Sequence, residues 1–317
     1  MTHRLGYVVA TLVMASASCV APRPRLDPAA TGGHTLRVQL AESGRIQDVA
    51  VEQYVAGSIL GEADIRGLTE GEAHQVAQLQ AILARTYALA NRDRHQDEGF
   101  DLCGTTHCQV YRPVDAMPVP LASLATAATR ATTGLVVAHD GLPINAVFHA
   151  DCGGGTSAAA VVWGGRTPSY LQAVDDPFCL RGDPPPWRFE VTHDDLLRAL
   201  NEDPSTHVGA HLDDLFVTEH DASGRVVRVL IQGNQSVAAV RGEELRRIMT
   251  RRFGVHSIKS SRFSITQFTD RFVFEGRGFG HGVGLCQRGA LVRVQAGHTS
   301  AEVLGHYYPG TSLTRYY

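Results

Sequence analysis

Residues 51–87 read VEQYVAGSILGEADIRGLTEGEAHQVAQLQAILARTY, a pattern that predicts two helices joined by a short loop. In the first, apolar residues recur at three- and four-residue steps from Val51 to Ile59, so they share one face. Glu62 falls on that same face. A carboxylate there either pairs with a cation, for which Arg85 is the candidate, or has a raised pKa because burial disfavours its charge. The sequence leaves both interpretations open.

The second helix has a clear start signal. Thr69 followed by Glu72 is a capping box, in which each side chain bonds the other residue's backbone amide. Gln80 lies on the apolar face of this helix, where its amide oxygen and nitrogen both need partners. Because the helix returns beside Glu62, the pattern predicts a polar pocket between the two helices.

Length and composition indicate an ordinary globular protein. The chain has 317 residues, of which 44% are hydrophobic and 19% charged, and its formal net charge is −3. It is long enough to bury one large core or two modest ones. A net charge this close to zero gives no reason to expect a nucleic-acid partner.

The N-terminus has the features of an export signal. Residues 1–19 combine a basic start with a short apolar run ending in small residues at Cys19, too short to span a bilayer. Cys19 is a candidate for lipid attachment, with ordinary cleavage nearby as the alternative, and such an anchor is the only membrane contact expected. Residues 20–33 are rich in Pro and Gly and predict a tether. We therefore expect an exported protein of the cell envelope, either periplasmic or a membrane-anchored lipoprotein.

Beyond the tether, the chain predicts an α+β domain over 34–317. Residues 34–43 alternate as a strand does, and 134–151 predict a hairpin that turns at Asp140-Gly141. An inserted α+β lobe is expected over about 189–275. The glycine run at 276–284 leads into a helix and leaves backbone amides free to approach a ligand. In outline, the prediction is a helical hairpin carrying Glu62, packed on antiparallel strands, with a supporting lobe.

Six blocks of the sequence resemble the stage II sporulation protein D (SpoIID/LytB) family, in the family's order. They are YVAGSILGE (54–62), LQAILARTYA (79–88), TTHCQVY (105–111), FHADCGGGTS (148–157), GRGFGHGVGLCQRGA (276–290) and HYYPGT (306–311). The resemblance implies a lytic transglycosylase acting on peptidoglycan glycan strands, with Glu62 as the catalytic acid. The residues expected to position the sugar are Gln80, Arg85, Thr86, Tyr111, His149 and His281.

The implied reaction cleaves the MurNAc–GlcNAc linkage and leaves 1,6-anhydroMurNAc ends, with glycan stripped of stem peptides as the implied substrate. Most glycosidases need two carboxyls. A lytic transglycosylase needs one, because the C6 hydroxyl of the sugar is the nucleophile. The family also contains amidase enhancers, so a non-catalytic glycan-binding protein that stimulates a cell-wall amidase is the alternative. A zinc amidase is disfavoured, since no H-E-x-x-H motif is present.

Five cysteines follow Cys19, in a compartment expected to be oxidising. Cys103 and Cys108 flank His107, and the resemblance favours structural zinc held by these three residues, with His149 or water completing the shell. A Cys103–Cys108 disulfide is the competing interpretation. No organic cofactor is expected.

The remaining cysteines and the aromatic residues of 160–187 carry weaker expectations. Cys152 and Cys179 suit a disulfide that ties the glycine loop at 153–155 to the segment before Cys179, which leaves Cys286 as a small buried thiol. Trp163, Tyr170 and Trp187 could form a wall for stacking sugars or could simply fill a long connection.

Overall fold

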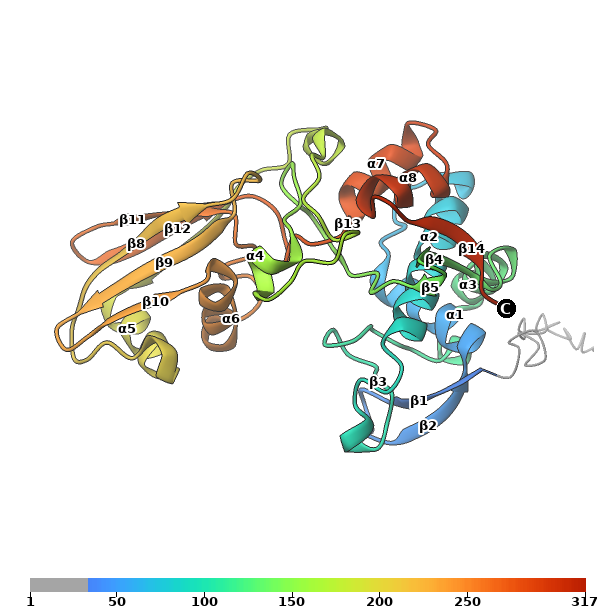
Figure 1. The fold of residues 1–317 in the computed structure, drawn as a ribbon, viewed down its shortest axis with the longest axis horizontal. Coiled ribbons are helices and arrows are strands. Elements are labelled where there is room, and N and C mark those ends of the chain that lie inside the picture. The colour runs from blue at the N-terminus through green and yellow to red at the C-terminus, as the bar shows by residue number, and fades with distance from the viewer. Residues whose placement is uncertain (1–33) are drawn as a thin grey trace, which may run out of the picture.

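The computed structural model describes residues 34–317 and confirms the α+β class. Its helices alternate with short strands along the chain (Figure 1). The α-helices are α1 Val51–Glu62, α2 Glu70–Ala90, α3 Val119–Ala131, α4 Ala159–Trp163, α5 His193–Asn201, α6 Gly242–Phe253, α7 Gln287–Gln295 and α8 Ser300–Tyr307. The 3-10 turns are η2 Gln96–Glu98, η3 Val114–Ala116, η4 Pro177–Leu180 and η5 Pro204–Thr206.

The strands form several small sheets instead of one large one. They are β1 Thr35–Gln39, β2 Ile46–Ala50, β3 Leu102–Cys103, β4 Leu135–His139, β5 Leu142–Pro143, β6 Phe148–His149, β7 Trp187–Thr192, β8 Leu212–His220, β9 Val226–Gly233, β10 Val237–Val240, β11 Phe263–Gln267, β12 Arg271–Gly276, β13 Leu285–Cys286 and β14 Ser312–Arg315. Their orders are β2-β1-β3, β10-β9-β8, β11-β12-β7, β13-β6 and β14-β4-β5. Only the β1–β3 and β6–β13 pairs among these are parallel.

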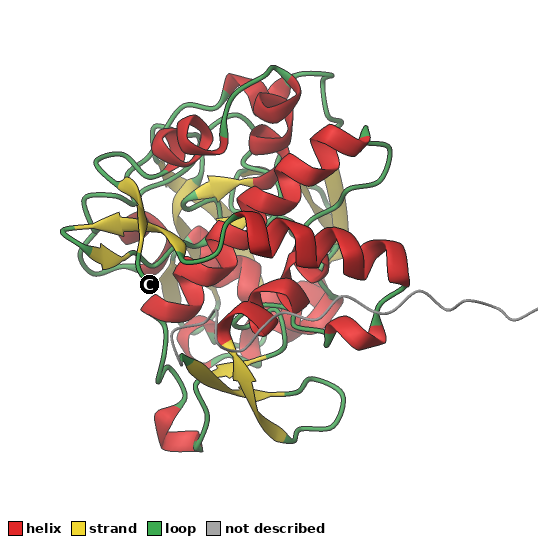
Figure 2. Cartoon of the chain, turned by 90° about the vertical axis from the view of Figure 1, so that its right-hand side faces the viewer, coloured by secondary structure: helices red, strands yellow, loops and turns green. Residues whose placement is uncertain are grey.

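The elements gather into two bodies side by side (Figure 1). The main body holds α1–α3, α7 and α8, with the β1–β2–β3 sheet at one edge of the helices (Figure 2). The second body, which we call the lobe, consists of β7–β12 with α5 and α6. Its buried apolar residues, among them Leu196, Ile231 and Phe272, form a cluster separate from those of the main body.

The two central helices of the main body begin and end close to where the sequence predicts. Thr69 and Glu72 form both hydrogen bonds of the capping box at the start of α2. Between α1 and α2 lies a buried ion pair, in which Arg85 Nη2 is 2.6 Å from Glu52 Oε2. Tyr317 at the end of the chain donates a further 2.6 Å hydrogen bond to Glu52 Oε1. These contacts hold α1, α2 and the C-terminus together.

The hairpin predicted over 134–151 is only partly formed. Asp140 and Gly141 make the turn, with φ of 51° and 78°, and β4 pairs with the two-residue β5. The chain then leaves this sheet, and β6 pairs with β13, which lies far along the sequence. This pairing brings His149 beside the glycine run at 276–284.

No helix within residues 34–317 is long and apolar enough to cross a membrane. The predicted export signal over 1–19, the lipidation candidate Cys19 and the tether over 20–33 lie outside the described residues and stay predictions.

Candidate functional site

Glu62 is the last residue of α1, and its side chain is half-buried. Its Oε1 accepts a 2.6 Å hydrogen bond from the backbone amide of Val110. Burial raises the pKa of the Glu62 carboxyl, and the Val110 amide offsets part of that effect by favouring the charged form. Within residues 34–317 no cation forms an ion pair with it. The carboxyl is therefore suited to hold and release a proton.

The proposed pairing of Glu62 with Arg85 is wrong. Arg85 is fully buried and donates from Nε and Nη2 to the two carboxylate oxygens of Glu52, at 2.9 and 2.6 Å. Thr86 is also fully buried, where its hydroxyl donates to Ile82 O at 2.6 Å. The structure does not bring Arg85 and Thr86, both expected to position the sugar, to the cavities beside Glu62.

Two glycines of α1 let the loop before Tyr111 lie directly against the helix. A Cβ on Gly61 would sit 2.6 Å from Val110 O, and one on Gly57 would collide with the Tyr111 ring and Arg112 O. A four-residue spacing places both glycines on one helix face. This close approach brings the Val110 amide within reach of Glu62.

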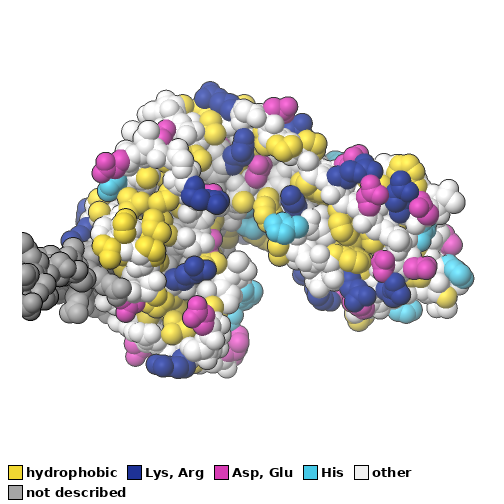
Figure 3. All heavy atoms as spheres, turned by 180° about the vertical axis from the view of Figure 1, so that it is seen from behind, with side chains coloured by type: hydrophobic (Ala, Val, Ile, Leu, Met, Phe, Trp, Pro, Cys, Tyr) yellow, Lys and Arg dark blue, Asp and Glu magenta, His cyan; other side chains and the backbone are white. Residues whose placement is uncertain are grey.

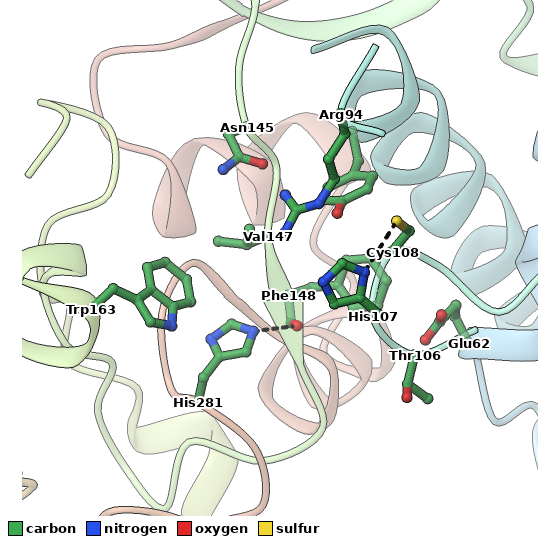
Figure 4. Close-up of a pocket in the computed structure, with 11 residues that line it drawn as sticks. Glu62, Arg94, Thr106, His107, Cys108, Asn145, Val147, Phe148, Trp163 and His281 are labelled. Atoms are coloured by element: carbon green, nitrogen blue, oxygen red, sulfur yellow. Dashed lines mark hydrogen bonds between the residues drawn. The ribbon is translucent and has the colours of Figure 1, made fainter. Parts of the chain in front are cut away.

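A cavity of about 410 Å³ opens beside Glu62. Figure 4 shows Glu62, Thr106 and His107 on one side of it and Trp163 and His281 on the other. The remaining lining residues are Tyr87, Arg94, Cys108, Asn145, Val147 and Phe148. They come from both ends of the described chain, and seen from behind the surface is hollowed between the two bodies (Figure 3).

Glu62 also lines a second cavity, of about 380 Å³. Gln80 lines it, as predicted from its place on α2, together with Leu285 and Gln287. The Nε2 atom of Gln80 is buried and has no hydrogen-bond partner among the described residues. Gln287 Nε2 donates to the backbone oxygen of Glu62 at 2.9 Å, which ties α7 to the end of α1. Glu62 thus stands where two hollows meet.

His281 and His149 lie together beside the first cavity, with ring centroids 5.4 Å apart. His281 Nε2 bonds to Phe148 O at 2.9 Å, and its Nδ1 accepts from the Val283 amide at 3.1 Å. Both nitrogens are therefore used inside the protein, in a neutral tautomer. Burial lowers the pKa of His281, and the same cause lowers the pKa of His149. His149 is buried, and its Nε2 has no hydrogen-bond partner within residues 34–317.

Tyr111 lies behind the site and does not line either cavity beside Glu62. It is buried and stacks on Tyr54 at 5.3 Å with an interplanar angle of 14°. Burial raises the pKa of its hydroxyl to about 12. In this structure Tyr111 supports α1 and the loop that carries the Val110 amide.

The loop beside Glu62 carries a cluster of four metal-ligand residues: His95, Cys103, His107 and Cys108. Their donor atoms all lie within 4.8 Å of one another. His107 Nδ1 is 3.7 Å from Cys103 Sγ and 3.8 Å from Cys108 Sγ, and His95 Nε2 is 3.3 Å from Cys108 Sγ. Ligands of tetrahedral zinc are separated by about 3.5–3.8 Å, so this donor set fits zinc.

The fourth donor is His95, not the predicted His149, which lies with His281 instead. His95 Nδ1 is 2.6 Å from Glu98 Oε1, a contact that leaves Nε2 to face the sulfurs. Cys103 and Cys108 are free thiols, as are Cys152 and Cys179, so neither predicted disulfide is formed. A histidine shortly before the C-x₄-C pair was the available sequence signal for this ligand.

The aromatic residues of 160–187 divide between site and core. Trp163 is 46% exposed, and its ring lies 5.1 Å from that of His281. Trp187 is buried in the lobe, and Tyr170 packs against the main-body core. Two cavity residues, Arg94 and Asn145, had been missed because they lie in aperiodic segments. The only sequence signal for a role in the cavity was their residue types, a cation and an amide.

Two family models match the chain. The stage II sporulation protein model matches residues 40–139, which include Glu62 and the cluster of His95, Cys103, His107 and Cys108. A domain of unknown function (DUF8618) matches residues 186–284, which include the lobe and the whole glycine run at 276–284.

Curated relatives align over most of the chain. An uncharacterised protein of Brachyspira hyodysenteriae is 27% identical over 86% of this chain and 68% of its own length. Stage II sporulation protein D of Bacillus subtilis is 24% identical over 90% of this chain and 83% of its own length. The amidase enhancer of the same organism is 25% identical over 76% of this chain, which spans 38% of that longer protein. Together with the family model, these relatives support a relationship of the chain to the stage II sporulation protein D (SpoIID/LytB) family.

Proposed function

We propose that this protein is a lytic transglycosylase that cleaves the MurNAc–GlcNAc linkages of peptidoglycan and leaves 1,6-anhydroMurNAc ends. The observation that carries the proposal is the Glu62 carboxyl, half-buried and without a cation partner among the described residues, where two cavities meet. The relatives named amidase enhancer and stage II sporulation protein D support a role at the cell wall.

In this mechanism Glu62 acts twice. Its raised pKa favours the protonated form, from which the carboxyl donates its proton to the glycosidic oxygen as the bond to C1 breaks. The resulting carboxylate then takes the proton of the C6 hydroxyl as that oxygen attacks C1. The Val110 amide stabilises the carboxylate between the two steps. The carboxyl ends the cycle in its original form.

A single carboxyl suffices for this reaction, and the surroundings of Glu62 agree with that requirement. Among the described residues that line the first cavity, Glu62 is the only acidic one. The second cavity adds Asp64, which bonds Arg66 at 2.6 Å, and that contact lowers the pKa of Asp64 to about 2. Asp64 is therefore ionised and paired with Arg66, and among the described residues no second carboxyl that could hold a proton lines either cavity.

The two cavities would hold sugars on either side of the broken bond. On one side Trp163 offers an exposed ring for stacking, beside the neutral ring of His281. On the other, Gln80 offers an unpaired amide nitrogen as a donor to a sugar oxygen. His149 supports the first side by bonding to Val283 O, and Tyr111 supports the loop from behind.

Arg94 supports a preference for glycan without stem peptides. Its guanidinium lines the first cavity and donates only to Asn91 Oδ1, at 3.4 Å, within the described residues. A stem peptide is joined to MurNAc through an amide of the lactyl group, and its removal leaves a carboxylate. A guanidinium binds that carboxylate by charge-assisted hydrogen bonds.

Zinc at His95, Cys103, His107 and Cys108 belongs to the same proposal. When bound, the ion would brace the loop that presents the Val110 amide to Glu62, as a structural site does. His107 and Cys108 also line the cavity, so the brace would shape its wall.

The decisive experiment compares Glu62→Gln with the wild type on purified glycan lacking stem peptides, with products identified by mass spectrometry. We expect anhydro ends from the wild type, about 10²-fold or lower turnover in the variant, and unchanged glycan binding. Asp64→Asn is the matched control and should retain most of the activity. Hydrolytic, reducing ends from the wild type, or wild-type turnover by Glu62→Gln, would contradict the proposal.

The relative named amidase enhancer favours one alternative, a glycan-binding protein that stimulates a cell-wall amidase. That function predicts glycan binding with no release of anhydro ends by the wild type. It also predicts that Glu62→Gln stimulates an amidase as well as the wild type does. The same preparation distinguishes the two functions.

A further inference from the structure

A second group of cysteines is buried beneath the glycine loop at 153–155. Cys152 precedes that loop, Cys179 lies in η4, and Cys286 ends β13. Asp176, just before η4, completes the group. All four side chains are fully buried, and the proposed glycan reaction uses none of them.

The four donor atoms have the spacing of ligands around one ion. They all lie within 4.8 Å of one another. Cys179 Sγ is 3.5 Å from Cys286 Sγ, and Cys152 Sγ is 3.4 Å from Asp176 Oδ2. Tetrahedral zinc, with bonds of about 2.3 Å to sulfur and about 2.0–2.2 Å to oxygen, separates two sulfurs by about 3.8 Å and a sulfur from an oxygen by about 3.5 Å.

Backbone amides surround the sulfurs as they surround thiolates. Cys286 is the N-cap of α7, and its Sγ accepts from the amides of Gly289 at 3.3 Å and Cys152 at 3.2 Å. Cys152 Sγ accepts from the amide of Gly154 at 3.4 Å. Amides directed at a sulfur, and the positive end of a helix, favour the deprotonated form that binds metals.

Asp176 is held by partners on its outer side. Tyr307 donates to its Oδ2 at 2.6 Å, and Arg293 donates to its Oδ1 at 3.2 Å. Such contacts orient a ligating carboxylate, because they fix its plane while an oxygen lone pair remains for the ion. Gly289 also belongs to this arrangement, since a Cβ there would collide with the Asp176 carboxylate and the Tyr307 hydroxyl.

We propose that Cys152, Asp176, Cys179 and Cys286 form a structural site for one divalent cation that prefers thiolate ligands, such as zinc. Binding releases the three thiol protons to solvent, while Asp176 enters as the ion-pair partner of Arg293. The two positive charges of the cation offset half of the negative charge of the four buried ligands, and Arg293 offsets part of the rest.

The site would join three segments that are distant in sequence: the loop after β6, η4 and the start of α7. β6 carries His149, and the glycine run that carries His281 ends at β13. An ion here would therefore fix the cavity wall opposite Glu62. This site does not depend on Glu62 being catalytic and is separate from the cluster at His95.

The test measures metal and thiols in the full exported chain grown with zinc and dialysed without chelator. We expect Cys286→Ser to contain about one equivalent of zinc less than the wild type. Cys103→Ser, in the other cluster, should retain that equivalent. After unfolding in chelator without reductant, alkylation should label all five cysteines that follow Cys19.

A second measurement keeps the test decisive if Cys286→Ser fails to fold. Titration of metal-free Cys103→Ser with cobalt should give one equivalent with thiolate-to-cobalt charge-transfer absorption. Zinc content unchanged by Cys286→Ser, a cobalt titration without that absorption, or a disulfide between any two of the three cysteines in non-reducing peptide maps would each overturn the proposal. Absence of glycan cleavage, by itself, would contradict the proposed function of Glu62 but not the proposed metal site.

Discussion

At the scale of the residue, two opposing influences act on Glu62. Burial disfavours its charge, whereas the Val110 amide stabilises that charge, and burial has the larger effect on the pKa. A carboxyl in this balance is suited both to give and to take a proton. A fully buried carboxyl would resist losing its proton, whereas a fully exposed one would be ionised and have no proton to donate.

The raised pKa of Glu62 predicts a pH-dependent stability difference. A carboxyl whose pKa is raised by folding contributes stability below its ordinary pKa and loses it as pH rises through the folded-state pKa. Glu62→Gln has no such loss, so its Tm advantage over the wild type should grow as pH rises above the ordinary value of 4.5.

Thermal unfolding measured from acid to neutral pH checks this prediction. Asp64→Asn is a control, because the pKa of Asp64 is shifted in the opposite direction. Arg66 lowers the pKa of Asp64 to about 2, so whatever stability that carboxylate contributes is lost as pH falls from 3.8 toward 2. A Tm difference between Glu62→Gln and wild type that stays constant with pH would contradict a raised pKa in the folded protein.

Arg94 should determine the preference for a free lactyl carboxylate. Arg94→Gln should lower kcat/KM on glycan without stem peptides by about 10- to 100-fold, the equivalent of a charged hydrogen bond of about 1.5–3 kcal/mol. Arg92→Gln, on the same turn but outside the cavity, is the matched control. On glycan whose lactyl carboxyls have been reduced to alcohols, wild type and Arg94→Gln should be equal. An undiminished advantage of the wild type on reduced glycan would exclude this role.

At the scale of the element, the position of Glu62 depends on how closely the loop approaches α1. Gly61→Ala would place a Cβ 2.6 Å from Val110 O and move the amide that bonds Glu62. Displacements of about 1 Å at a reacting group cost up to about 100-fold in rate. We therefore expect kcat/KM to fall by about 10- to 100-fold.

Gly71→Ala is the control for Gly61→Ala, because nothing lies within 4 Å of a Cβ at that helical position. Alanine favours a helix over glycine, so this variant should keep its activity and gain slightly in stability. Wild-type activity of Gly61→Ala would show that the loop is free to move without cost to the site.

The elements that the sequence predicts well are those set by local signals. α2 begins at its capping box, and α1 ends at Glu62 as its periodicity indicates. The β6–β13 pair was not predicted, because two strands of two residues each carry no periodicity and their pairing depends on the rest of the fold.

The same limit applies to side-chain partners at the site. Helical phase placed Glu62 correctly on an inward face, but it could not show that Arg85 would pair with Glu52 instead. His95 was missed as the fourth donor because the loop that returns it to Cys108 has no regular period. Residue type identified the candidates, whereas their grouping required the three-dimensional structure.

At the scale of the molecule, two bodies with separate apolar cores meet through polar contacts. Arg225 of the lobe is fully buried and donates from Nη2 to Cys152 O at 2.8 Å. A Cβ on Gly282 would collide with that guanidinium, so the glycine run lies directly on it. Ser157 of the main body bonds Asp221 of the lobe at 2.5 Å. The lobe is thus joined to the segments that form the wall of the candidate site.

Asp221 is the acceptor on which this junction depends. Its Oδ1 accepts from the amides of Ser223 at 2.9 Å and Arg225 at 2.8 Å and from the Ser223 hydroxyl at 2.7 Å, while Oδ2 accepts from the Ser157 hydroxyl. Asp221→Ala removes all four bonds, and hydrogen bonds to a charged group contribute about 1.5–3 kcal/mol each, not additively. We expect a loss of about 3 kcal/mol or more in the free energy of unfolding.

Because each body has its own core, weakening the junction should also separate their unfolding. Calorimetry of Asp221→Ala should show two transitions where the wild type shows one, the lower of them the lobe. Glu219→Ala, at an exposed position on β8, is the control and should unfold like the wild type. If Asp221→Ala unfolds in one transition at the wild-type Tm, the polar contacts do not couple the bodies. If it unfolds in two, and glycan cleavage falls with the first, the lobe supports the site across the junction.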